Sequence, residues 1–241
     1  MEKDKKILLS LVMVILVLAG VFGSFAWFGS HKNDSVVNDS QKFKEEYEFY
    51  NGKINENNQM NYPVVEVGNT NVIEYLTDDE AASFLKDGTG LIYFGYSTCP
   101  WCRTMVPVLL SAAKSTNLGK IYYVDIQNIR DQISLDDKNN LVVTDEGTNG
   151  YREILKELDE VLEPFYLTGK DGKKVDTLEK RLYAPTVVSV KNGEILGIHV
   201  DTVESQKSGY SPLSKEESEA LFQIYQEMIL KLLGSTCDES C

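Results

Sequence analysis

The order of predicted strands and helices is the feature that most constrains how this chain can fold. The apolar patterns predict strands at residues 62–67, 91–96, 121–126, 186–190 and 194–200. They predict helices from the Thr77–Glu80 capping signal through Lys86, from about Pro100 to Lys114, and from about Ser214 to Leu233. Strands that alternate with helices and end in a hairpin about Lys191–Gly193 indicate an α/β fold, in which helices cover both faces of a mixed sheet.

A long apolar segment precedes this pattern. Residues 7–28 form an uncharged run of 22 residues after three lysines. A membrane-spanning helix needs about 20 apolar residues, whereas the apolar core of a cleaved secretory signal is shorter. Residues 1–28 are therefore expected to form a single N-terminal transmembrane anchor, with a cleaved signal as the alternative. Both place the following chain outside the cytoplasm, either held at the cytoplasmic membrane or secreted.

The remaining chain divides into a polar tether, one domain and a short tail. Residues 29–61 are rich in Asn, Asp, Ser and Lys and are predicted to form the tether, with a short solvated helix near residues 42–50. The domain is expected over residues 62–236, before a cysteine-containing tail at 237–241. The hydrophobic content of 42% supports a packed core, and the net charge of −13 argues against a nucleic-acid partner.

The candidate chemistry lies at Cys99-Pro-Trp-Cys102, where a buried strand meets a helix. Unpaired N–H groups and the dipole at a helix N-terminus favour the thiolate of the first cysteine. The second cysteine lies one turn further on, close enough to displace a mixed disulfide. This spacing predicts thiol–disulfide exchange, in which Cys99 is the attacking sulfur and Cys102 the resolving one.

Half of a zinc site has the same cysteine spacing. A zinc site would need a second pair of ligands, for which the sequence offers His31, His199, Cys237 and Cys241. The last two do not have the usual spacing of zinc ligands. We therefore expect neither a metal nor another cofactor.

Three segments together resemble the thioredoxin superfamily. The run Tyr93–Pro107 is similar to its active-site strand and helix, including a proline five residues after the second cysteine. Ala184-Pro185-Thr186 resembles the family's cis-proline loop, and Lys191–Glu194 resembles the hairpin after it. The likeness covers roughly residues 62–234 and is nearest to membrane-tethered thioredoxin-like proteins of Gram-positive bacteria, some of which are called bacteriocin transport accessory proteins.

The resemblance implies a thioredoxin-like fold and a role for each site residue. Cys99 and Cys102 would be the redox pair, and Pro100 and Trp101 between them would tune its potential. Pro185, expected in cis, and the backbone of Ala184 would bind the substrate strand. The expected partners are thiols and disulfides of secreted or membrane proteins, with a membrane redox partner as a further candidate.

The chain departs from the family pattern in two places. Tyr93 occupies the position where typical members bury an acidic residue, which puts reductase activity of the cytosolic kind in doubt. The 83 residues between Cys102 and Pro185 exceed the minimal fold, and the surplus lies within about 128–181. This insertion is expected to be helical, with an amphipathic helix at 151–162, and to lie either near the active-site rim or away from substrate.

Several residues keep more than one interpretation. Trp101 is either a substrate contact or a packing residue, and Arg103 is expected to be a solvated helix residue. Cys237 and Cys241 are a candidate secondary thiol pair, either an isolated disulfide or incidental thiols, or a relay to Cys99.

The expected function is that of an extracytoplasmic thiol–disulfide oxidoreductase. The alternative is a non-catalytic accessory or binding protein for a transporter or a secreted peptide.

Overall fold

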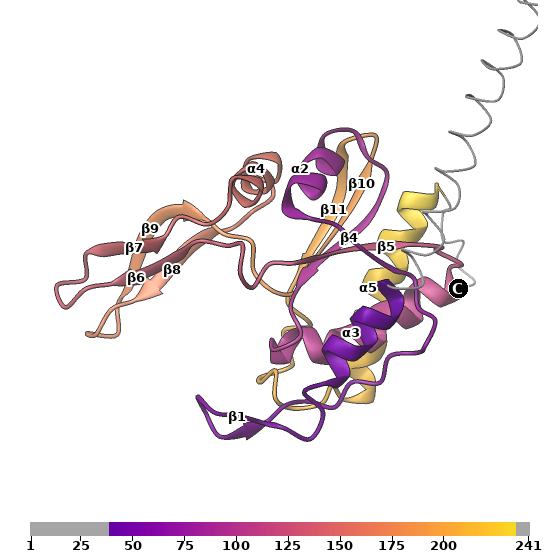
Figure 1. Cartoon of the computed structure of the whole chain (residues 1–241), viewed down its shortest axis with the longest axis horizontal. Helices are drawn as coiled ribbons and strands as arrows, with labels where there is room; N and C mark the ends of the chain where they lie inside the picture. The colour runs from indigo at the N-terminus through magenta and orange to yellow at the C-terminus, as the bar shows by residue number, and fades with distance from the viewer. Residues whose placement is uncertain (1–38, 235–241) are drawn as a thin grey trace, which may run out of the picture.

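A five-stranded mixed sheet lies at the centre of the computed structural model, which describes residues 39–234 (Figure 1). Its strands are β3 (Ile73–Tyr75), β4 (Gly90–Gly95), β5 (Ile121–Asp125), β10 (Thr186–Lys191) and β11 (Glu194–Val200). Their order is β11-β10-β4-β5-β3. The first three in sequence are parallel, whereas β10 is antiparallel to β4 and β11 is antiparallel to β10.

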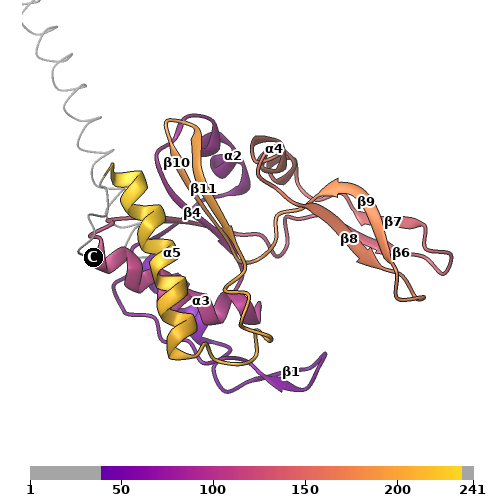
Figure 2. The same cartoon turned by 180° about the vertical axis from the view of Figure 1, so that it is seen from behind.

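Helices cover both faces of this sheet, as the strand pattern predicts. A helix over residues 39–48, α3 (Pro100–Ser115) and α5 (Lys215–Leu233) pack on one face. The other face carries α2 (Asp78–Asp87) and α4 (Asn149–Glu157), and Figures 1 and 2 show the two layers from opposite sides. Residues of β4 alternate between the two cores: Leu91 and Tyr93 enter the first, and Ile92 and Phe94 enter the second.

Local signals set the ends of the helices close to where the sequence predicts them. Capping boxes at Thr77 with Glu80 and at Ser214 with Glu217 begin α2 and α5. Gly234 ends α5 in the left-handed region, at φ +73. The hairpin of β10 and β11 turns at Asn192 and Gly193, which both have positive φ.

The segment before β3 differs from the expected tether. Residues 39–48 form a helix whose Phe43 and Tyr47 side chains are fully buried in the core beside α3. A short hairpin of β1 (Ile54–Asn55) and β2 (Met60–Asn61) follows. Residues 39–48 therefore belong to the packed structure, because two aromatic residues one turn apart bury one side of an otherwise polar helix, whereas the hairpin that follows is largely exposed.

Residues 62–67 are extended but do not form the predicted strand. Their side chains alternate between buried and exposed, and this alternation produced the prediction. Their backbone instead bonds to side chains: Asn51 bonds both N–H and C=O of Val65, and Glu48 accepts from the Val67 N–H. Pro63 has no N–H with which to join a sheet.

The insertion between β5 and β10 is largely a pair of β-hairpins rather than helical. The hairpins are formed by β6 (Gln132–Leu135), β7 (Leu141–Asp145), β8 (Pro164–Thr168) and β9 (Lys174–Lys180), and together we call them the arm. Figures 1 and 2 show the arm projecting away from the central sheet. Its turns contact one another through the Lys170–Asp137 ion pair. The predicted helix at 151–162 is present as the shorter α4.

Residues 1–28 and the Cys237–Cys241 tail lie outside the described residues. Within residues 39–234, no helix is both long enough and apolar enough to cross a membrane.

Candidate functional site

The two cysteines lie where β4 meets α3. Cys99 is the N-cap of α3, in an extended backbone conformation, and its Sγ accepts the Cys102 N–H at 3.3 Å. Pro100 occupies the first turn of the helix, where its missing N–H leaves no bond unmade. The sequence therefore places the Cys99 sulfur among N–H groups at the start of the helix, as its motif predicts.

The two sulfurs have opposite acidities. The pKa of Cys99 is lowered, chiefly by its hydrogen bond with the Cys102 side chain, and further by the N–H groups of Cys102 and Trp101. The pKa of Cys102 is raised well above its ordinary value, chiefly by burial and then by Cys99. Both residues are free thiols in this structure. Cys99 is thus the sulfur more easily ionised.

The cis-proline loop faces Cys99. The Ala184–Pro185 peptide bond is cis, as expected, and the Cys99 thiol donates to the Ala184 carbonyl at 3.4 Å. Pro185 leads directly into β10, and its carbonyl accepts the Asp201 N–H at 2.8 Å. Tertiary structure therefore joins residues 85 positions apart in the sequence into one site.

The site is more enclosed than the sequence suggests. An attacking sulfur must be reached by its client, yet only 3% of the Cys99 surface is accessible, and Cys102 has none. The loop after β11 packs closely on Trp101, two residues after Cys99: a Cβ built on Gly209 would lie 2.8 Å from Trp101. Trp101 is half-buried beneath this loop, which supports its interpretation as a packing residue.

Arg103 is fully buried, so the expectation of a solvated helix residue is wrong. Its guanidinium and Nε donate to the carbonyls of Tyr47 at 2.6 Å, Pro63 at 2.8 Å and Ser97 at 3.0 Å, and to Asn51 Oδ1 at 2.7 Å. Arg103 therefore ties α3 to the segment before β3 and to the loop that precedes Cys99. The planar guanidinium group carries five N–H donors in a fixed arrangement, so one arginine side chain can bind several carbonyls at once.

Tyrosines line the core beneath Cys102. Tyr47 and Tyr93 are fully buried, and their hydroxyl oxygens are 2.6 Å apart. Tyr93 acts to lower the pKa of the Cys102 thiol, against the larger effect of burial. Tyr93 was noted in the sequence as a departure from an acidic position, but Tyr47 was missed, because nothing local to residues 42–50 indicates a partner 46 positions away.

The base of the arm touches the active-site loop. Arg130 donates to the Tyr96 hydroxyl at 3.3 Å and lies 5.2 Å from the centre of its ring. Thr98, next to Cys99, bonds Gln127 at 3.3 Å. Of the two positions that the sequence left open for the insertion, its base therefore lies at the active-site rim.

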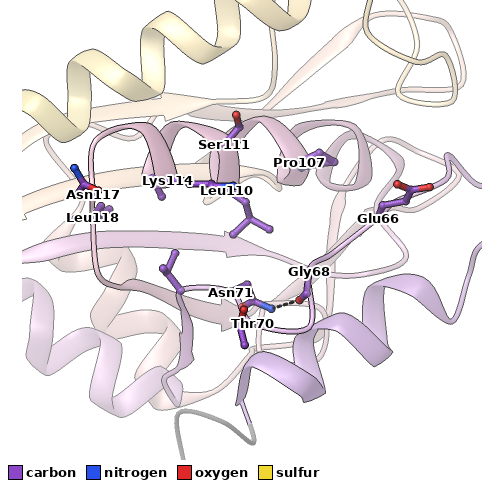
Figure 3. A pocket seen from close by; sticks show the side chains of 12 residues that line it. Glu66, Gly68, Thr70, Asn71, Pro107, Leu110, Ser111, Lys114, Asn117 and Leu118 are labelled. Carbon is purple, nitrogen blue, oxygen red and sulfur yellow. Dashed lines mark hydrogen bonds between the residues drawn. The ribbon is translucent and has the colours of Figure 1, made fainter.

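A groove lies away from the cysteines. It has a volume of about 660 Å³ and runs between the C-terminal half of α3, with the turn after it to Leu118, and the loop from Glu66 to Val72 (Figure 3). Asn71 closes its floor by a bond to the Gly68 carbonyl at 3.4 Å. The groove does not reach the redox motif.

The described residues form no cluster of the metal-binding kind. Across residues 39–234, no group of three or more His, Cys, Asp or Glu side chains could hold a metal ion. His199 Nε2 instead pairs with the Thr202 carbonyl at 2.8 Å. His31, Cys237 and Cys241 lie outside the described residues.

Comparison of the chain with models of known protein families and with curated proteins finds no match.

Proposed function

We propose that this chain is an extracytoplasmic thiol–disulfide oxidoreductase with a thioredoxin-like fold, acting on protein clients through Cys99 and Cys102. One observation carries the proposal: Cys99, with its lowered pKa, caps α3 and faces the cis Ala184–Pro185 bond across a 3.4 Å contact. When Cys99 ionises, its thiol no longer donates to the Ala184 carbonyl, so the thiolate can attack a disulfide while that carbonyl pairs with the client strand.

The proposed fold rests on the order of strands in the sheet and on the two residues, Cys99 and Pro185, that lie next to the end of β4 and the start of β10. The order β11-β10-β4-β5-β3, with a cysteine-bearing helix after β4 and a cis-proline before β10, is compatible with a thioredoxin-like domain. Because β4 and β5 are parallel and β10 is antiparallel to β4, the C-terminal end of β4 lies beside the N-terminal end of β10. That edge brings Cys99 and Pro185 together.

The exchange needs no cofactor. The Cys99 thiolate attacks one sulfur of a client disulfide, which forms a Cys99–client disulfide and releases the other client sulfur as a thiolate. Cys102 then attacks Cys99, forms the Cys99–Cys102 disulfide and releases the second client sulfur. The client gains two electrons and two protons, and the reverse sequence oxidises a client dithiol.

The location and the partners belong to the same proposal. The apolar run at residues 7–28 would hold the domain at the outer side of the cytoplasmic membrane, where disulfides persist. Secreted or membrane proteins with exposed thiols or disulfides are the clients, and a membrane redox protein would restore the Cys99–Cys102 pair.

Single-cysteine variants of the full chain test this function. The background carries Cys237→Ser and Cys241→Ser, so that the tail thiols do not react. Cys99→Ser should abolish exchange with a disulfide-bonded model protein such as insulin, and Cys102→Ser should accumulate a mixed disulfide that gel electrophoresis without reductant detects. Normal exchange by Cys99→Ser would refute the proposal.

The burial of Cys99 favours a second candidate, a non-catalytic accessory protein for a transporter or secreted peptide. With 3% of its surface accessible, Cys99 meets a large client only if residues packed around it move. The reduction potential of the pair separates the candidates. A potential well below about −300 mV would indicate a static bridge, and a higher one would support turnover.

A further inference from the structure

The β6–β7 hairpin of the arm exposes a run of apolar side chains to solvent. All five residues of β7 are exposed, and Leu141, Val142 and Val143 are successive aliphatic residues with 40%, 38% and 55% of their surface accessible. Because burial of apolar surface is favourable, a strand rarely leaves such a run open unless another molecule binds there. The exposed run therefore indicates a binding surface.

The backbone edge of the same strand is also open. The β6–β7 hairpin is a two-stranded sheet of its own, so among residues 39–234 no further strand pairs with β7. Leu141 lies opposite Leu135 on one face of the hairpin. Val143 lies opposite Ile133 on the same face, which is therefore apolar. An apolar face beside an unpaired backbone edge suits an extended chain that adds to the sheet as a third strand.

The second hairpin of the arm, in contrast, is protected against such pairing. Pro164 begins β8 without an N–H, and Lys174 and Lys180 lie at the two ends of β9. Leu178 has φ +61 in β9, where the register with β8 shifts. Prolines, lysines and irregular pairing all hinder the addition of another strand. β7 has no proline or lysine, and its pairing with β6 is regular along residues 141–143.

The arm begins and ends at the candidate active site. At its start, Gln127 bonds Thr98, the residue before the first cysteine, and β6 begins five residues later at Gln132. At its end, three residues lead from β9 to the cis Ala184–Pro185 bond. Five extended residues span about 17 Å at most, so the whole of β7, which pairs with β6, lies within about 35 Å of Gln127. Roughly ten extended residues of a client cover that distance.

We propose that β7 binds an extended, apolar segment of the client by strand addition, while a cysteine of the same client reacts with Cys99. The segment is rich in β-branched residues, which pack well against Leu141 and Val143 across a strand pair. The client is not yet folded, because a strand inside a folded sheet already has its neighbours. Backbone pairing supplies affinity without demanding one client sequence. This inference rests on the proposed function and names its substrate class.

Peptides that differ in one segment test the proposal on the full chain, in detergent, with Cys237→Ser and Cys241→Ser. Each peptide has one cysteine, activated as a mixed disulfide with 5-thio-2-nitrobenzoate, and a test segment about eight residues away. The Cys99 thiolate attacks the peptide sulfur, forms a Cys99–peptide disulfide and releases the coloured thiolate. At low peptide concentration, a segment of alternating valine and threonine should react about tenfold faster than one of glycine and serine, a difference of about 1.4 kcal/mol.

Two variants and a modified peptide locate the effect on β7. Val143→Lys places a protecting charge on the exposed run and should reduce the preference to about twofold or less. Leu178→Lys is the matched control: it makes the same kind of change in the other hairpin, at a side chain that is 87% exposed, and should keep the preference. Circular dichroism checks that both variants are folded. Methylation of alternate peptide nitrogens, in one of the two registers, should abolish the preference while the side chains stay the same.

A reagent without a polypeptide segment, 5,5′-dithiobis(2-nitrobenzoate), separates this inference from the proposed function. It should react equally fast with the parent chain and with Val143→Lys. If the parent chain does not react with it, Cys99 is not reactive and the proposed function fails. If the parent chain reacts but does not distinguish the peptides, the binding role of β7 is wrong and the redox function stands.

Two further results would also overturn the binding role of β7. An equal loss of preference in Leu178→Lys and Val143→Lys would show a general effect of charge on the arm. Size-exclusion chromatography with light scattering examines a second copy of the chain as the occupant. A dimeric parent chain that Val143→Lys makes monomeric, with the peptide preference unchanged, would assign the β7 edge to that second copy.

Discussion

The Arg103 guanidinium donates to the Tyr47 carbonyl at 2.6 Å, with both residues fully buried. This bond joins the helix that carries the cysteines to the helix over residues 39–48. The same guanidinium holds the Ser97 carbonyl at 3.0 Å, two residues before Cys99. The segment before β3 therefore helps to position the redox motif, although it is distant from it in sequence.

Replacing Arg103 should destabilise the domain strongly. Arg103→Met keeps much of the side-chain volume but removes the donor from two buried carbonyls, those of Tyr47 and Pro63, and from the half-buried Ser97 carbonyl; each buried unsatisfied group costs about 1–3 kcal/mol. We expect a loss of about 3 kcal/mol or more in the free energy of unfolding, measured by urea denaturation. Asn51→Ala, which removes one partner, should cost less. Equal stability of Arg103→Met and the parent chain would contradict this role.

Two glycines with the same backbone conformation allow the cost of backbone strain to be measured separately from the cost of a steric clash. Gly172 and Gly193 both have φ +78, but a Cβ on Gly193 would lie 2.1 Å from the Lys86 carbonyl, and one on Gly172 meets nothing within 4 Å. Gly172→Ala should cost about 1–2 kcal/mol, from the left-handed backbone alone. Gly193→Ala should cost a further 1–3 kcal/mol, because α2 and the hairpin must shift. Thermal unfolding of both variants provides the comparison, and equal losses would argue against the close contact.

The acidity of Cys99 should appear in its alkylation rate. The Cys102 side chain and the helix N–H groups lower its pKa, so reaction with iodoacetamide should reach half its maximal rate below the ordinary thiol value of about 8.5. Asp201 acts in the opposite direction and raises the Cys99 pKa. Asp201→Asn keeps an acceptor for the Thr202 N–H and removes the charge, so it should move the midpoint to lower pH. A midpoint unchanged by Asp201→Asn would show that the carboxylate does not act on Cys99.

The position of Gly234 argues against a relay through Cys237 within one chain. Helix α5 ends at Gly234 beside the Lys191 side chain, at the opposite end of β10 from Pro185. Six strand residues span about 20 Å, whereas the three residues from Gly234 to Cys237 reach about 10 Å at most. We expect no Cys99–Cys237 disulfide within a chain. Mass spectrometry after mild oxidation, at several protein concentrations, checks this, and a concentration-independent adduct would disprove it.

Elements with local signals could be predicted from the sequence. The caps at Thr77 and Ser214, the end at Gly234 and the Lys191–Gly193 turn depend on residues within a few positions of each other. The strand–helix junction at Cys99 is local in the same sense, and so the redox motif was found with its correct structural setting.

Where prediction departed from structure, contacts over long sequence separations were the cause. Alternation at 62–67 indicated a strand, but that segment has no neighbouring strand, and its polar groups bond to Asn51 and Glu48. The arm was expected to be helical because α4 carries the stronger periodic signal, whereas its hairpins expose many side chains and so lack a buried face to mark them.

Sequence alone identified the candidate site residues: two cysteines at the start of a helix, and a proline that opens a buried strand. Tertiary structure decided their surroundings. It buried Arg103, brought Tyr47 to the Tyr93 hydroxyl and closed the loop around Gly209 over Trp101. The physical reason is that capping and turn preferences act within a few residues, whereas burial and hydrogen-bond partners depend on which distant segments pack together.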